Sequence, residues 1–100
     1  MRKFSLGIIV GTTAAVAALE RNNQLPTAFL ERHESGDWGE VSEEAKKEND
    51  LSVEEGFRIL SVYSLKDGTK IWILTEDDRS VTTLLLPDDH WEDPCGTSAV

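Results

Sequence analysis

The change of residue pattern at Gly56 constrains the fold of this chain more than any other feature. After it, residues 57–65, 70–75 and 80–86 are rich in β-branched and aromatic side chains, a composition typical of strands. Asp67-Gly68 separates the first two of these segments and is a strong hairpin-turn signal. Three successive strands with short connections predict an antiparallel meander.

The N-terminal nineteen residues allow two interpretations. Met1-Arg2-Lys3, followed by an apolar and alanine-rich run, resembles a cleaved signal peptide, although the run is too short for a membrane span. The same residues also predict a strand over Phe4–Val10, broken by Gly11, and then a helix over residues 14–19. We favour the strand and helix, because removing a signal would leave only about eighty residues with no disulfide to staple them.

Two further helices are expected between the first helix and the meander. Pro26 suits the first turn of a helix that ends at Gly36, and Ser42 can cap another that ends at Gly56. The sequence therefore predicts one α+β domain over residues 1–90, with an N-terminal strand, two to three helices and an antiparallel β-meander. The sheet has four strands if the N-terminal strand joins it. Residues 91–100 are expected to form a flexible acidic tail.

The charge of the chain is strongly negative and unevenly distributed. Its 100 residues carry a net charge of −9, divided as +2 over residues 1–30, −7 over 31–55, +2 over 56–75 and −6 over 76–100. A broad nucleic-acid surface needs clustered Lys and Arg, so the charge argues against this class of partner. The acidic blocks have two interpretations: they are solvated faces that keep the protein soluble, or they dock on a basic partner or mimic nucleic acid.

Four segments resemble a family of small bacterial proteins carried on plasmids, phages and other mobile elements. They are RHESGDWG (32–39), RILSVY (58–63), IWILTE (71–76) and DRSVTT (78–83). The resemblance covers roughly residues 4–87 and implies a short cytoplasmic α+β domain with no agreed activity. Some members are labelled type I restriction M subunits, but a methyltransferase subunit needs a nucleotide-binding α/β domain with a Gly-rich turn. This chain has neither that length nor that turn.

Two polar connectors hold the candidate binding residues, which are His33, Asp37, Trp38, Asp78, Arg79 and Ser80. We expect His33, Asp37 and Arg79 to share one rim, because loops at the ends of regular elements commonly carry sites. A His and an Arg at such a place can cleave a phosphodiester by acid–base chemistry, as in small metal-independent RNase toxins. The structural alternative is that His33 caps the second helix, Asp37 caps the turn to Trp38, and Arg79 bridges to a neighbouring acid.

The remaining chemistry of the chain is sparse. Its single cysteine, Cys95, excludes an internal disulfide framework and has no nearby base, and Trp91 is a candidate anchor for a partner. No residue spacing indicates a metal site or a cofactor. We therefore expect a cytoplasmic, non-catalytic interaction protein of a mobile element that binds a host or plasmid protein through its acidic surface. A counter-defence role fits this expectation, and an RNase-like enzyme using His33 and Arg79 is the alternative.

Overall fold

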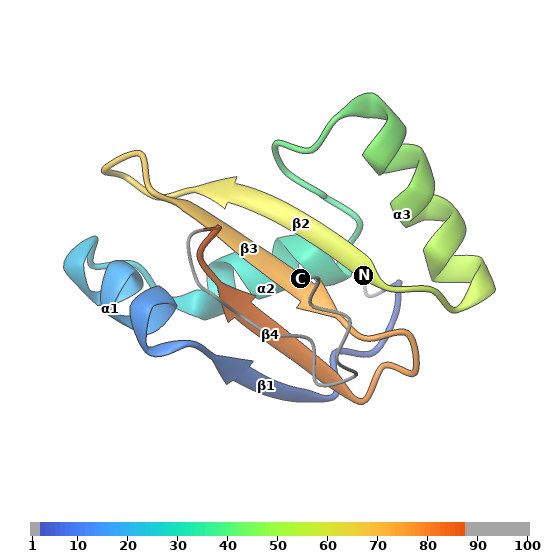
Figure 1. Ribbon diagram of the computed structural model, residues 1–100, viewed down its shortest axis with the longest axis horizontal. Coiled ribbons are helices and arrows are strands. Elements are labelled where there is room, and N and C mark those ends of the chain that lie inside the picture. The colour runs from blue at the N-terminus through green and yellow to red at the C-terminus, as the bar shows by residue number, and fades with distance from the viewer. Residues whose placement is uncertain (1–2, 88–100) are drawn as a thin grey trace.

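The computed structural model describes residues 3–87, which form three helices and one four-stranded sheet (Figure 1). In chain order the elements are β1 (Ile8–Gly11), α1 (Thr13–Arg21), α2 (Pro26–Glu34), α3 (Glu43–Glu55), β2 (Ile59–Ser64), β3 (Lys70–Thr75) and β4 (Val81–Leu85). The predicted α+β class, with an N-terminal strand, helices and then a meander, is confirmed. The expected tail, with Trp91 and Cys95, lies outside the described residues.

The N-terminal strand joins the sheet, which is therefore mixed and not purely antiparallel. The strand order is β1-β4-β3-β2, with β1 parallel to β4 and the other neighbours antiparallel. β1 begins at Ile8, later than the expected Phe4, because Gly7 turns the chain with a φ of +68°. A Cβ at Gly7 would lie 2.4 Å from the carbonyl oxygen of Ser80, so only glycine fits where the chain meets β4.

Short local signals set the helix ends. The hydroxyls of Thr12 and Ser42 accept the backbone N–H groups of Ala15 and Ala45, at 3.1 and 3.0 Å, and so cap α1 and α3. α3 ends at Gly56, which adopts the left-handed conformation with a φ of +83°. Such caps satisfy N–H and C=O groups that a helix leaves without partners.

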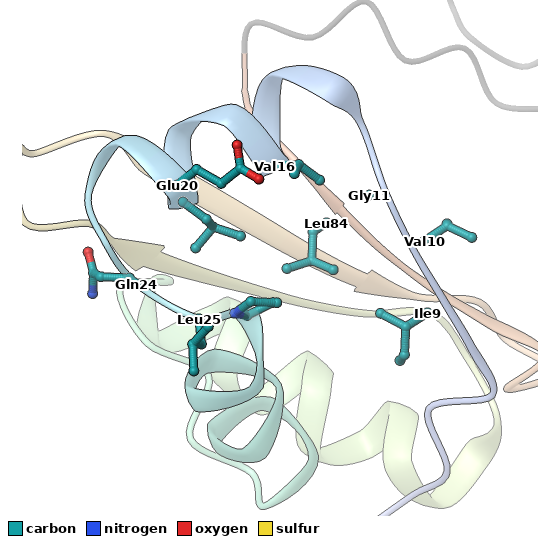
Figure 2. A pocket seen from close by; sticks show the side chains of 10 residues that line it. Ile9, Val10, Gly11, Val16, Glu20, Gln24, Leu25 and Leu84 are labelled. Carbon is teal, nitrogen blue, oxygen red and sulfur yellow. The ribbon is translucent and has the colours of Figure 1, made fainter.

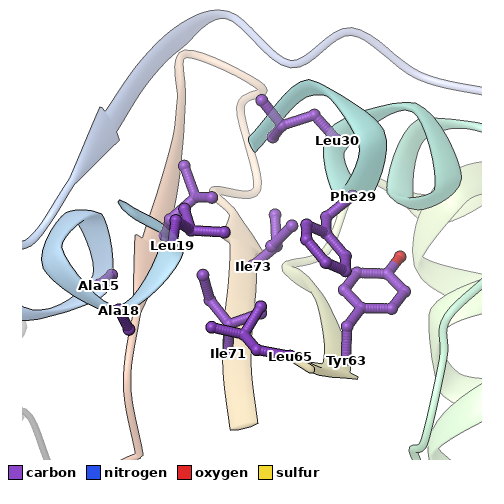
Figure 3. Packing of buried hydrophobic residues seen from close by; sticks show 10 residues of the cluster. Ala15, Ala18, Leu19, Phe29, Leu30, Tyr63, Leu65, Ile71 and Ile73 are labelled. Atoms are coloured by element: carbon purple, nitrogen blue, oxygen red, sulfur yellow. The ribbon is translucent and has the colours of Figure 1, made fainter. Parts of the chain in front are cut away.

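One face of the sheet and the inner sides of α1 and α2 form the hydrophobic core (Figure 3). Tyr63, Ile71, Ile73 and Leu84 belong to adjacent strands and point to the same side, because they are cross-strand neighbours or lie two positions apart. The helices contribute Ala15, Ala18, Leu19, Phe29 and Leu30. On the other side of the sheet Trp72 is half-buried.

The free edge of β2 is covered by polar contacts. The side chain of Asn49 in α3 donates to the Leu60 carbonyl at 2.8 Å and accepts its N–H at 3.2 Å. Further along the strand, Val62 donates its N–H to the carbonyl of Trp38 and accepts the N–H of Glu40. Asn49 thus acts as a substitute for a neighbouring strand and attaches α3 to the sheet. Figure 1 shows α3 on the β2 side of the sheet.

We expect Asn49→Ala to lower the free energy of unfolding by about 2 kcal/mol, because it leaves the N–H and C=O of Leu60 without partners. Urea unfolding followed by circular dichroism measures the change. Lys47→Ala, an exposed substitution on the same helix, is the control and is expected to change stability by less than about 0.5 kcal/mol. Equal midpoints for Asn49→Ala and the control would show that α3 is held by other contacts.

Candidate functional site

The ring of Phe4 brings together three of the six candidate residues. Its centroid lies 5.1 Å from that of His33 and 6.1 Å from that of Trp38. The guanidinium carbon of Arg79 lies 5.6 Å from the same ring, in cation–π geometry. Residues from α2, the α2–α3 connector and the β3–β4 turn thus meet around the N-terminal segment.

His33 points into the protein, not towards solvent. It lies in the last turn of α2, four residues after Phe29 and three after Leu30, so helical geometry places it on their inward face. None of its surface is exposed. Its Nδ1 lies 2.6 Å from the Ser61 hydroxyl and its Nε2 lies 2.9 Å from the Thr75 hydroxyl. Both ring nitrogens are therefore occupied by strand side chains.

The far end of this hydrogen-bond chain determines the tautomer of His33. The Thr82 hydroxyl donates to the carbonyl of Leu6 at 2.7 Å, so it must accept from Thr75, whose hydroxyl is 2.8 Å away. The Thr75 oxygen in turn accepts from His33, which places the ring proton on Nε2. Nδ1 is then an acceptor for the Ser61 hydroxyl. A neutral imidazole therefore satisfies every group in this series of hydrogen bonds.

Burial of the imidazole, and secondly the positive charge of Arg79, lower the pKa of His33 to about 3. At neutral pH the ring therefore carries no charge. A general acid or base must exchange a proton with its substrate, and its pKa is best placed near the working pH. His33 satisfies neither condition in this structure, and its contacts are those of a structural residue.

Arg79 uses its guanidinium to hold backbone carbonyls. Nη1 donates to the carbonyls of Phe57, Glu76 and Asp77 at 2.7, 3.0 and 3.2 Å, and Nη2 donates to the carbonyl of Ser52 at 2.7 Å. The last contact lies near the C-terminus of α3, where the helix dipole favours a cation. Arg79 itself has a φ of +60°, an unusual conformation for a residue with a Cβ. One side chain thus joins the β3–β4 turn to α3.

Asp37 pairs with Arg32, not with Arg79. The Arg32 Nε donates to the Asp37 carboxylate at 2.7 Å, and this hydrogen bond is the largest cause of the lowered pKa of Asp37. The guanidinium of Arg32 also lies 4.5 Å above the ring of Tyr63, whose hydroxyl donates to the Asp37 carbonyl at 2.5 Å. Both charged side chains of the pair are about half exposed, so the pair contributes only about 0–1 kcal/mol.

Asp78 and Ser80 form a polar turn on the surface. The Asp78 carboxylate accepts the hydroxyl of Ser80 at 2.6 Å and its backbone N–H at 3.0 Å. These two bonds lower the pKa of Asp78. Both residues are exposed, whereas Trp38 is buried and donates its indole N–H to Asp50 at 3.0 Å. A binding role for the six candidate residues stays a prediction.

Sequence reasoning did not identify the residues that organise this region. Phe4 was placed in the strand, and Ser61 and Thr75 were assigned to strands without a role. The usable signal was the spacing of His33 from Phe29 and Leu30, which predicts an inward-facing histidine in need of polar partners. In the described part of the chain, every buried side-chain nitrogen or oxygen has a hydrogen-bond partner.

Comparison with known proteins adds no family to this picture. Protein-family models, curated proteins and solved structures contain no match to this chain. Between residues 3 and 87, no group of three histidine, cysteine or carboxylate side chains is arranged to hold a metal ion. Over the same range, no helix has the length and apolar character needed to cross a bilayer.

Proposed function

We propose that this protein is a non-catalytic interaction protein that binds a basic surface of a host or plasmid protein through its acidic helix α3. The observation that carries the proposal is the exposure of α3. The helix contains six acidic residues and two lysines, yet only Asn49 and Ser52 are buried. A helix with so little apolar contact contributes little to the core, so its rigid attachment serves presentation of its outer face.

Polar contacts from three other elements hold α3 in place. Asn49 bonds to β2, Asp50 accepts the indole N–H of Trp38, and Arg79 donates to the carbonyl of Ser52. A helix fixed in this way loses little conformational freedom when it binds a partner, which favours affinity.

The outward side of α3 has a simple pattern. Glu44, Glu48, Leu51 and Glu55 recur at helical spacing and are all exposed, and Leu51 is 51 % exposed. Carboxylates around one apolar side chain match a basic surface that has an apolar hollow. Attraction between opposite charges would speed the encounter with such a partner and fall with added salt.

The contacts of His33 and Arg79, the two residues suited to catalysis, favour a binding function over an enzymatic one. The alternative, an RNase-like enzyme, needs His33 and Arg79 to reach a phosphodiester, whereas both side chains are occupied by internal hydrogen bonds. The resemblance to mobile-element proteins supplies the class of partner, a host defence or replication protein or a plasmid-encoded one, in the cytoplasm. A counter-defence role belongs to this proposal.

We expect Glu48→Lys/Glu55→Lys to reduce partner capture from nuclease-treated bacterial lysate by at least ~10-fold while the melting temperature stays the same. Raising the salt concentration should weaken capture by the unmodified protein. The control is Glu20→Lys/Glu31→Lys, which changes the net charge equally at exposed positions on other helices. Equal loss in both variants would mean that only net charge matters, and no loss in either would remove α3 from the binding surface.

A further inference from the structure

The outer edge of β1 is the least protected part of the described sheet. Ile8, Ile9 and Val10 are 68, 42 and 43 % exposed, although all three are large and apolar. The N–H groups of Ile8 and Thr12 donate towards β4, so the alternating residues Ile9 and Gly11 direct their backbone groups outwards. Such a row of outward N–H and C=O groups is a template for another strand.

The two edges of the sheet differ in how far their backbone groups are covered. The β2 edge is covered by Asn49 and by residues 38–40, as described above. The sequence of β1, IIVG, contains neither a charged residue nor a proline, two of the devices that usually protect an edge.

An apolar groove of about 310 Å³ runs beside the β1 edge (Figure 2). Figure 2 shows it between β1, α1 and the start of α2, with Ile9 at one side and Leu25 at the other. Leu25 is 72 % exposed and Val16 is 44 % exposed. At Gly11, the missing side chain keeps the groove open, because a Cβ there would lie 3.2 Å from Val16.

We propose that β1 pairs antiparallel with β1 of a second copy of this chain, forming a two-fold dimer with a continuous eight-stranded sheet. The distribution of charge favours a second copy at this edge. Each chain carries a net charge of −9, which opposes self-association, but α3 with its carboxylates lies at the opposite edge beside β2 (Figure 1). Pairing through β1 therefore places the two acidic helices at the far ends of the dimer.

The side chains of β1 select one register for this pairing. If Val10 lies on the two-fold axis, Ile9 faces Gly11 of the second copy, and the outward backbone groups of both residues form ladder bonds. Ile9 of one copy then extends over Gly11 of the other copy, which has no side chain. It enters the groove of that other copy beside Val16. Because the contact is two-fold, the same insertion occurs twice.

Sedimentation equilibrium between 1 and 200 µM tests the dimer, which we expect for the unmodified protein. Ile9→Lys/Val10→Lys should be a monomer with an unchanged circular dichroism spectrum, because it places charges at the paired edge. Leu51→Lys, which adds one lysine on the exposed side of α3 and away from the paired edge, is the control and should remain a dimer. A monomer at 200 µM for the unmodified protein overturns the proposal. Partner capture through α3 is measured in a separate experiment. A negative result for the dimer therefore does not affect the proposed function, and the reverse also holds.

Cysteine cross-linking tests the register. In a Cys95→Ser background, Val10→Cys should form a disulfide-linked dimer under mild oxidation, because directly opposed Cα atoms of a non-hydrogen-bonded pair lie about 4.5 Å apart. Ile8→Cys should not cross-link, since in this register it faces Thr12 of the second copy. A dimer that cross-links through Ile9→Cys but not Val10→Cys would contradict this arrangement, and so would a monomer that captures an extended peptide along β1.

Discussion

Lowering the pH from 7 to 4.5 should reduce the free energy of unfolding by roughly 2–3 kcal/mol, and His33 should account for the loss. The imidazole has a pKa of about 3 in the folded protein and about 6.5 when the chain is unfolded. Between these values only the unfolded chain binds the proton, so stability is complete above pH 6.5 and declines by about 1.4 kcal/mol for each unit below it. Chemical denaturation at a series of pH values measures this slope.

His33→Gln should flatten the slope, even though the loss of the fitted hydrogen bonds lowers stability at every pH. The chain contains one other histidine, and His90→Gln is the control that measures how much of the slope comes from it. The carboxyls with lowered pKa values, among them Asp37 and Asp78, add their own acid sensitivity only at lower pH. If the variant does not fold, the His33 ring signals of the unmodified protein provide the test by NMR. A titration of these signals near pH 6.5 would show that the ring is not held neutral.

Arg79→Ala should lower the free energy of unfolding by about 2–4 kcal/mol and the melting temperature by at least ~10 °C. The substitution removes four charged hydrogen bonds and the cation–π contact with Phe4, and it separates the β3–β4 turn from α3. Arg79→Lys should recover little, because a single ammonium group does not reproduce the planar fork that reaches the carbonyls of Ser52 and Phe57.

Arg79→Gly separates the side-chain contacts from the backbone strain. Glycine relieves the strain of a positive φ, so this variant should be about 0.5–1 kcal/mol more stable than Arg79→Ala and still well below the unmodified protein. Arg21→Ala, which loses an exposed pair with Asp67, should change stability by less than about 1 kcal/mol. Differential scanning calorimetry compares the four proteins. If Arg79→Ala has the same melting temperature as Arg21→Ala, the hydrogen bonds of the Arg79 guanidinium do not stabilise the fold.

The parts of the fold that depend on neighbouring residues could be predicted from the sequence. The Asp67-Gly68 turn is one, since Gly68 adopts a φ of +91° and the Asp67 carboxylate accepts the N–H of Thr69 at 2.9 Å. The cap at Ser42 and the helix end at Gly56 are others. Each of these signals determines a turn or a helix end through contacts within about four residues. Contacts with distant parts of the chain therefore rarely change the outcome.

The pairing of β1 and the interior of the candidate site could not be predicted in the same way. The sequence contains no local signal that β1 lies parallel to β4, because that choice depends on a strand at the other end of the chain. Likewise, polar residues such as Ser61 and Thr75 look like ordinary strand residues until His33 is seen between them. The polar connectors contain His33, Trp38 and Arg79, which the structure brings together around Phe4, but their spacing did not distinguish buried side chains from exposed ones.

The parallel pairing of β1 and β4 also sets an order of assembly. Ile8 and Val81 are more than seventy positions apart, whereas β2 and β3 are joined by a short turn. Contacts between distant residues form slowly, because a long loop must close before they contribute. The hairpin can therefore form early, and β1 docks late. During synthesis a ribosome must complete residue 84 before β1 has its full partner, and until then Ile8, Ile9 and Val10 have no neighbouring strand on either side.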